Sequence, residues 1–236
     1  MRPLFIVPLL LWAAAGCSSS QTPVADEILA LDIDAVSFVD VVDHRYLPLL
    51  PGALRGYAPP APEARVHTSA EVSLTRRTIN GVEATETRTV STVDGVRATE
   101  TWRWYAQDTD GNVWRLGETH CRFLNGACAS MEGTWTWGTD DARPGIAMLA
   151  APELRGQRYA GAFRAGVVED TGEVVERVDS VNVGAGAFND CVRIHETSPL
   201  SAGRNLLYCA DVGLVRMREA GLLQELVEQS DPPPLQ

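Results

Sequence analysis

Three oxygen-bearing side chains stand at alternate positions near the middle of the chain: Asp108, Asp110 and Asn112. Carboxylate and amide oxygens at such a spacing are ligands that a calcium ion prefers. The order differs from an EF-hand loop, because Gly111 precedes the third ligand and Glu118 falls one residue short of the bidentate twelfth position. Tight hairpin turns favour Asp, Gly and Asn for backbone reasons alone. We therefore expect a structural turn here and keep a calcium site as the alternative.

Five tryptophans lie on segments that we expect to be neighbouring strands: Trp102, Trp104, Trp114, Trp135 and Trp137. A spacing of two places the first two on one face of a strand, and likewise the last two. They could line an apolar ligand cavity in a half-open barrel. The alternative is that they fill the core while Arg103 and Arg115 face solvent. A register shift of one residue exchanges the two faces, so the sequence leaves both interpretations open.

Four cysteines follow position 17: Cys121, Cys128, Cys191 and Cys209. In an exported chain they predict two disulfides, for which three connectivities exist. The first two flank the turn signal Asn125-Gly126, and the last two flank a segment that folds back about residue 200. We therefore expect the local pairs Cys121–Cys128 and Cys191–Cys209. Neither pair has the close spacing of a structural zinc site, so zinc with His120 or His195 is the weaker alternative.

Catalytic motifs are scarce. All twenty basic residues are arginine, which excludes Schiff-base lysines, phosphate loops of the Gly-Lys-Ser/Thr type and Ser-Lys nucleophile pairs. No Gly-x-Ser-x-Gly occurs, and His195-Glu196 lacks the second histidine of a zinc protease. The segment Gly184-Ala185-Gly186 has no helix after it, so we expect a bend rather than a phosphate site. We expect no catalytic residues and no cofactor.

The N-terminus predicts export. Arg2 precedes an apolar run from Leu4 to Trp12, which is too short to span a membrane as a helix. The run ends in Ala14-Ala15-Gly16-Cys17, which resembles the lipobox of bacterial lipoproteins, although Ala14 stands where that motif most often has Leu. The resemblance implies cleavage after residue 16 and lipidation of Cys17; the alternative is an ordinary signal peptide cleaved near Ala15. Ser18 at the next position implies sorting to the outer membrane.

Charge limits the partners. Without Arg2, 19 basic residues remain against 31 acidic ones, a net charge of −12. Such a surface argues against nucleic acid and against electrostatic docking on anionic lipid. Attachment to the membrane would therefore depend on the N-terminal lipid anchor. Residues 18–30, which are rich in Ser, Thr and Gln, predict a flexible tether.

Four two-residue turn signals recur at nearly even intervals: Asn80-Gly81, Asp94-Gly95, Asp110-Gly111 and Asn125-Gly126. The segments between them are rich in Val, Thr, Trp and Arg with partial alternation. This pattern predicts about five long antiparallel strands between residues 66 and 137.

The rest of the chain continues the β pattern with weaker signals. We expect a long connection over 138–157, strands over 158–168 and 174–183 joined by a turn at 170–172, and a strand over 188–197. A bulge at 211–213 precedes a strand over 214–218, and residues 222–229 form a last strand or short helix. The predicted fold is all-β: one domain over 31–229, an antiparallel meander that curls into an open barrel or sandwich, with few or no helices. Residues 230–236 are expected to be a disordered tail.

Several phrases together resemble a family of exported bacterial proteins, many of them lipoproteins, without established activity. The phrases span 46–52, 105–114, 143–146, 186–191 and 212–215, and the most specific is Tyr-Ala-Gln-Asp-Thr-Asp-Gly-Asn-Val-Trp at 105–114. The resemblance implies an antiparallel β domain at the cell envelope and supplies no catalytic residues. The chain departs from the pattern at 208–211, where the family would have further aromatic and glycine residues.

From these observations we expect a non-catalytic envelope lipoprotein that acts as a binding or carrier module for an apolar small molecule or a protein partner. A structural or interaction protein of the outer membrane without a small-molecule site is the alternative, and an envelope hydrolase is a third hypothesis.

Overall fold

The structure, a computed structural model, describes residues 28–33, 36–61 and 65–232. Its regular elements in those ranges are all strands, so the expected all-β class is confirmed. None of the described segments forms a helix of the length and hydropathy needed to cross a membrane. The signal peptide, Cys17 and most of the expected tether lie outside the described residues.

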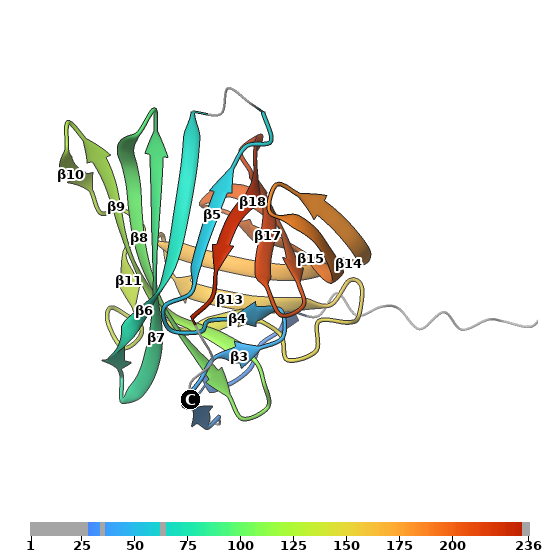
Figure 1. The fold of residues 1–236 in the computed structure, drawn as a ribbon. Coiled ribbons are helices and arrows are strands. Elements are labelled where there is room, and N and C mark those ends of the chain that lie inside the picture. Colours follow the sequence, from blue (N-terminus) through green and yellow to red (C-terminus); the bar gives the residue numbers. More distant parts are fainter. Residues whose placement is uncertain (1–27, 34–35, 62–64, 233–236) are drawn as a thin grey trace, which may run out of the picture.

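The strands follow one another along the chain with short connections (Figure 1). In the first half they are β1 (Ile28–Leu29), β2 (Phe38–Val39), β3 (Asp43–His44), β4 (Leu47–Pro48), β5 (Leu54–Ala58), β6 (Val66–Ile79), β7 (Val82–Val93), β8 (Val96–Asp108) and β9 (Val113–Leu124). In the second half they are β10 (Ala127–Ser130), β11 (Trp135–Thr136), β12 (Gly145–Met148), β13 (Arg158–Arg164), β14 (Val168–Val183), β15 (Gly186–Ser198), β16 (Ser201–Cys209), β17 (Gly213–Glu219) and β18 (Leu222–Ser230).

Turn chemistry fixes the long hairpins. At Asn80-Gly81, Asp94-Gly95 and Asn125-Gly126 both residues have positive φ, which is the conformation of a type I′ turn. The connection after Asp108 is longer: of its residues only Gly111 has positive φ, at 97°, and the Asp108 N–H donates to the Asn112 carbonyl over 2.9 Å. The expected turns are therefore present, but this one is a four-residue loop.

One large sheet contains all strands except β3 and β4, which pair with each other. Its main path runs β1-β13-β14-β15-β16-β17-β18-β5-β6-β7-β8-β9-β10. The pairs are antiparallel except β1 with β13, which is parallel, so the sheet is mixed rather than purely antiparallel. Figure 1 shows β6 to β10 on one side and β14 to β17 on the other, with β5 and β18 between them.

The sheet curls until its two ends approach each other. Strand β12 pairs with β9, and just before it Arg143 exchanges two backbone hydrogen bonds with Phe163 of β13, at 2.7 and 2.9 Å. A Cβ atom at Gly145 would lie 1.9 Å from the Gly161 carbonyl carbon, so this close crossing requires glycine. The expected open, curled sheet is therefore confirmed.

Several local predictions need correction. Strand β14 runs without a break through residues 170–172, and the turn lies at 165–167 instead. Gly172 is required by a close approach, since a Cβ there would lie 2.1 Å from the Tyr159 ring. In place of a fifth long strand before residue 137, two short strands, β10 and β11, both pair with β9. Residues 210–212 form a hairpin turn rather than a bulge, and the expected connection over 138–157 contains β12.

Candidate ligand-binding cavity

The inner face of the curled sheet carries polar as well as apolar side chains. On β8 the inward residues alternate as Thr99, Thr101, Arg103 and Tyr105, since these are the strand's residues that border the cavities described below. Trp102 and Trp104 therefore take the opposite face, as period two demands. Arg103 and Arg115, which the core-filling interpretation places toward solvent, border the cavities instead.

Two adjoining cavities lie inside the curl. The inner one has a volume of about 200 Å³ and is lined largely by apolar and aromatic side chains, among them Leu49, Val72, Ile146, Leu206 and Tyr208. The outer one, about 840 Å³, has walls rich in hydroxyl and amide groups. Two of its lining residues, Met131 and Leu200, are about half exposed, so this cavity reaches the surface.

Six ionisable residues form a layer between the two cavities, which we name the ionic belt: Arg103, Arg115, Glu118, Asp170, Glu196 and Arg204. Strand register places them in cross-strand pairs, because Arg103 lies opposite Glu118 on β8 and β9, and Glu196 lies opposite Arg204 on β15 and β16. Opposite charges at such positions attract across the ladder. All of them except Glu118 border both cavities.

The belt is internally paired. The Arg103 Nε donates to Glu118 Oε2 over 2.6 Å, and Arg115 lies 3.6 Å from the same oxygen. Arg204 donates through Nε and Nη2 to Glu196 Oε2, each over 2.6 Å. Arg115 also pairs with Asp170 of β14, which joins the two sides of the curl. Three arginines thus face three carboxylates, and the belt carries no net charge.

The paired arginines keep the belt glutamates ionised. Burial alone would raise the pKa of Glu118, but the adjacent Arg103 and Arg115 hold that pKa below its ordinary value. Likewise, burial would raise the pKa of Glu196, but Arg204 and Arg115 lower it. Glu196 in turn raises the pKa of Arg204. The belt is therefore a set of full charges on the walls that the two cavities share.

Tyr159 lies beside the ionic belt, and its hydroxyl has no hydrogen-bond partner among the described residues. Tyr159 of β13 is 1% exposed and borders the inner cavity. Its register partner is Gly172, which in turn pairs with Glu196, so the ring lies across β14 toward the belt. Burial raises the Tyr159 pKa well above its ordinary value, so the hydroxyl keeps its proton.

The five tryptophans mostly avoid the cavities. Trp135 lines the outer cavity, where the Arg115 guanidinium lies 5.6 Å from the centre of its ring. Trp104 and Trp114 are almost fully buried in the main core cluster. Trp102 and Trp137 pack against that cluster, and none of these four borders either cavity.

The bulge between Trp104 and Tyr105 shifts the register at the end of β8, a feature that the sequence pattern did not reveal.

The oxygen ligands suggested for calcium are engaged in protein contacts. Asp108 is 1% exposed; its Oδ1 accepts the Asn112 N–H over 2.8 Å, and its Oδ2 accepts from the Asn112 amide and the Trp114 indole. The Asn112 Oδ1 accepts from the Ala150 N–H over 2.9 Å. Asp110 is exposed. Within the described residues no group of three or more His, Cys, Asp and Glu side chains is placed to hold a metal ion.

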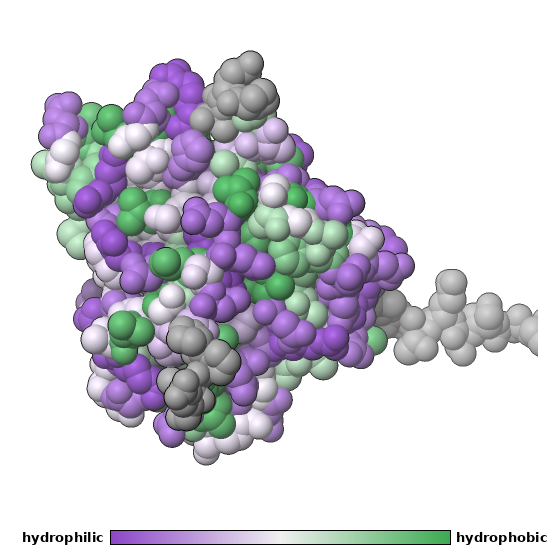
Figure 2. All heavy atoms as spheres, in the orientation of Figure 1, coloured by the Kyte–Doolittle hydropathy of each residue, from purple (hydrophilic) through white to green (hydrophobic). Residues whose placement is uncertain are grey.

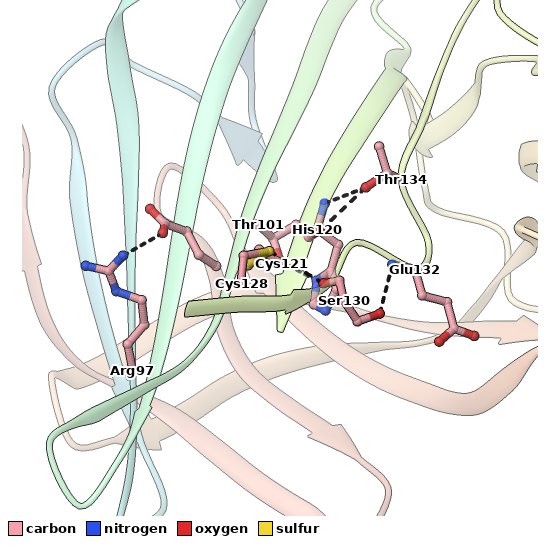
Figure 3. Close-up of a disulfide and its surroundings, with 9 residues drawn as sticks. Arg97, Thr101, His120, Cys121, Cys128, Ser130, Glu132 and Thr134 are labelled. Carbon is pink, nitrogen blue, oxygen red and sulfur yellow. Dashed lines mark hydrogen bonds and ion pairs between the residues drawn. A yellow bond between two sulfur atoms is a disulfide. The ribbon is translucent and has the colours of Figure 1, made fainter. Parts of the chain in front are cut away.

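Both disulfides form in the expected pairing. Cys121 and Cys128 join β9 to β10, with Cα atoms 5.7 Å apart, and Figure 3 shows this bridge beside His120 and Thr134. Cys191 and Cys209 are direct register partners on β15 and β16, with Cα atoms 4.0 Å apart. The second bridge is fully buried, whereas Cys128 of the first is exposed.

The four histidines lie apart and each has its own surroundings. His44 is buried; its Nδ1 accepts the Tyr46 N–H and its Nε2 donates to the Leu149 carbonyl, both over 3.0 Å. Burial lowers the His44 pKa, so the ring is neutral. His67 is exposed, and His120 lies at the outer cavity, where its Nδ1 contacts the Thr101 hydroxyl over 3.0 Å. His195 is half-buried against Gly203.

The outer surface in the view of Figure 2 is mostly hydrophilic, with hydrophobic residues interspersed among polar ones. The most exposed large apolar side chains are Leu74, Leu154, Val96 and Leu124. They belong to different segments of the chain. The interior therefore offers the more specific arrangement of chemical groups.

Two solved structures are similar to this chain. One, from Bacteroides fragilis, is provisionally described as an exported protein with a YmcC-like fold; the identity is 12%, the TM-score is 0.44, and the match covers 80% of this chain and 100% of that one. The other, from Parabacteroides distasonis, is provisionally described as a lipoprotein, with 14% identity, a TM-score of 0.36, and coverage of 79% and 99%. No family model and no curated protein matches the chain. Sequence identities of 12% and 14% with TM-scores of 0.44 and 0.36 assign no function to this chain.

Proposed function

We propose that this protein is a non-catalytic binding protein of the bacterial envelope that holds a small amphipathic molecule inside its curled sheet. The observation that carries the proposal is that the two cavities adjoin at the ionic belt, where Arg103, Arg115 and Arg204 line both. A ligand can place an apolar segment among the residues of the inner cavity and a polar segment among those of the outer one. Pockets that combine apolar walls with a few polar groups are the usual form of small-molecule sites.

The proposed place of action follows from the N-terminus. The lipobox-like segment before Cys17 supports attachment through a lipid, and Ser18 supports sorting to the outer membrane. The two disulfides agree with an oxidising compartment, because such bonds persist outside the cytosol. A carrier held at a membrane would be close to a source of amphipathic molecules.

A cavity-filling variant tests the proposal. Ala70 of β6 borders the inner cavity, so Ala70→Phe places a ring in the space that we assign to the apolar segment. Native mass spectrometry of protein purified from envelopes should detect a bound amphiphile in the wild type and little or none in this variant. Displacement of the apolar fluorescent probe N-phenyl-naphthylamine provides a second measurement.

Ser69→Phe is the matched control. Ser69 is the adjacent residue on β6; it is exposed and borders neither cavity, so the same ring is added outside the site. This variant should keep wild-type ligand occupancy. A wild-type protein that carries no amphiphile and takes up no probe would contradict the carrier function and favour a purely structural or interaction role.

A further inference from the structure

The chemistry of the ionic belt limits the kind of ligand that the cavities accept, given the proposed carrier function on which this step rests. We infer that the ligand is an uncharged amphiphile whose polar head carries hydrogen-bond acceptors and meets the Tyr159 hydroxyl at the belt.

The belt gives a charged head no unpaired partner. Each belt arginine already faces a carboxylate: Arg103 faces Glu118, Arg115 faces Asp170, and Arg204 faces Glu196. A carboxylate or ammonium head placed among them would lose part of its hydration and would meet charges that are already compensated. Moving an unpaired charge into such an interior is strongly unfavourable, whereas an uncharged polar head avoids that cost.

The outer cavity supplies neutral hydrogen-bonding groups. Thr68, Ser91 and Gln224 form a connected set on its wall: the Thr68 and Ser91 hydroxyls lie 2.9 Å apart, and the Gln224 amide donates to Thr68 over 3.0 Å. Thr89 and Thr101 border the same cavity. Besides the belt carboxylates Glu118, Asp170 and Glu196, two more, Glu132 and Glu219, border this cavity, but both are exposed, so water and salt screen them. The deeper wall thus suits a head that exchanges hydrogen bonds without charge.

Tyr159 adds a directional donor. Its hydroxyl is buried and unpartnered among the described residues, although burial of an unsatisfied hydroxyl is costly. Gly172 leaves the space in which the ring lies, since a Cβ at that position would overlap it. The pairing of Gly172 with Glu196 brings the ring to the belt, where the two cavities meet. The hydroxyl itself has almost no accessible surface, so the ring must turn slightly toward the cavity before the protonated hydroxyl donates to an acceptor on the head of a ligand.

Three probes of equal chain length test the inference: monodecanoylglycerol, decanoate and decyltrimethylammonium, which have a neutral, an anionic and a cationic head. Each is titrated, below its aggregation concentration, against the wild-type protein loaded with N-phenyl-naphthylamine. We expect the neutral probe to displace the dye with an affinity at least about tenfold above that of either charged probe. Equal or tighter binding of decanoate or decyltrimethylammonium would overturn the inference.

Tyr159→Phe tests the donor. Loss of one hydrogen bond to the ligand should lower the affinity for monodecanoylglycerol about tenfold and leave the affinity for the dye unchanged. Since this hydroxyl has no protein partner, the variant should be at least as stable to heat as the wild type. Unchanged affinity for monodecanoylglycerol would contradict the role of Tyr159.

Tyr46→Phe is the control, because Tyr46 is buried, borders neither cavity and donates its hydroxyl to Asp190 Oδ1 over 3.0 Å. It should lose some stability and keep the affinity for the neutral probe. The outcomes also separate the two proposals. Binding without preference for the neutral head overturns this inference alone, whereas the absence of any binding, of the dye and of all three probes, overturns the carrier function as well.

Discussion

At the scale of single residues, Asp108 illustrates how one carboxylate can be occupied by its own loop. Both of its oxygens accept hydrogen bonds, from the Asn112 backbone and amide and from the Trp114 indole. Asp108 and Asn112 are residue types found in calcium loops, but here their side chains form hydrogen bonds that stabilise a turn. The distinction depends on the rotamer of Asp108, which the sequence does not specify.

This arrangement predicts how Asp108 responds to substitution. Asp108→Ala should lower the free energy of unfolding by about 3 kcal/mol, because buried donors lose their acceptor. Asp110→Ala, at an exposed position of the same loop, should change it by less than about 0.5 kcal/mol. Denaturant titration of both variants measures the difference.

The same geometry predicts no response to calcium. The Tm of the wild type should be the same in millimolar calcium chloride as in the presence of a chelator. Both carboxylate oxygens of Asp108 already accept hydrogen bonds from the protein. A calcium-dependent rise in Tm that disappears in Asp110→Ala would show instead that the loop is a calcium site. Differential scanning calorimetry decides between the two.

From the shifted pKa values of three residues we expect the free energy of unfolding to fall in two separate pH ranges as the solution becomes acidic. The His44 pKa is lowered from 6.5, so its contribution is fully present above that value and is lost as pH falls through the lower folded pKa. The pKa of Glu118 and that of Glu196 are lowered from 4.5, so a further loss begins below 4.5. Unfolding free energies measured between neutral pH and acid should therefore show an early shallow decline and a later steep one.

Substitutions separate the two pH ranges. Glu196→Gln should reduce the decline below 4.5 and leave the earlier one, since His44 lies outside the belt. His44→Gln should remove the earlier decline at some cost in stability, because the ring bonds to Tyr46 and Leu149 are lost. A wild-type profile that is flat from neutral pH down to 4.5 would contradict the assignment to His44.

At the scale of elements, register decides which side chains share a face. Arg103 faces inward because β8 alternates through Thr101, Arg103 and Tyr105, which places the neighbouring tryptophans outside the cavities. The sequence shows that Trp102 and Trp104 share a face, but not which face is concave. The structure shows that the side with the tryptophans packs in the core.

The two disulfides close loops of different length, so their removal should differ in effect. Cys191 and Cys209 are 18 residues apart and Cys121 and Cys128 are 7 apart. On the chain-entropy model, loss of the Cys191–Cys209 bridge lowers the free energy of unfolding by about 3 kcal/mol, and loss of the Cys121–Cys128 bridge lowers it by about 2 kcal/mol. The buried pair, replaced by alanines, should in addition leave small cavities in the core.

Denaturant unfolding of the two double-alanine variants measures this order of stability. The wild type under reducing conditions is the control, since it should approach the sum of both losses. A larger loss on removal of Cys121–Cys128 would contradict the expectation.

At the scale of the whole molecule, the curl brings together residues that are far apart in the chain. Arg115 of β9 meets Asp170 of β14, and Arg143 pairs with Phe163, although no local pattern connects these positions. The interior belt exists only because the sheet bends until its ends approach. Buried charges at such a joint require partners, and each carboxylate of the belt has one.

The location of the whole protein is testable at Cys17. The wild type should incorporate an alkyne-labelled fatty acid and fractionate with membranes, whereas Cys17→Ala should lose the label. Cys128→Ala is the control, since it removes another cysteine and should keep the label. Release of an unlabelled wild-type protein would support an ordinary signal peptide cleaved near Ala15 instead.

Ser18→Asp addresses the choice of membrane. If Ser18 permits sorting to the outer membrane, the substituted protein should shift to the inner membrane in density-gradient fractions and remain lipidated. An unchanged distribution would contradict the sorting prediction.

The all-β class, most of the tight turns and the pairing of the cysteines follow from the sequence alone. These features are local: Asn-Gly and Asp-Gly favour positive φ, alternation marks strands, and a hairpin brings residues at equal distance from its turn together. The sequence pattern missed the continuity of β14, because Gly172 resembles a turn residue until the Tyr159 ring is placed over it.

The direction of curvature, and with it the set of side chains in the interior, is visible only in the folded sheet. Whether Arg103 or Trp104 faces the concave side depends on contacts between strands from opposite halves of the chain, such as Arg115 with Asp170. The hydrophobic pattern of one strand carries no information about them, since a curved sheet buries side chains on both of its faces. The cavities and the ionic belt are therefore properties of the curled sheet as a whole, and no single segment of the sequence encodes them.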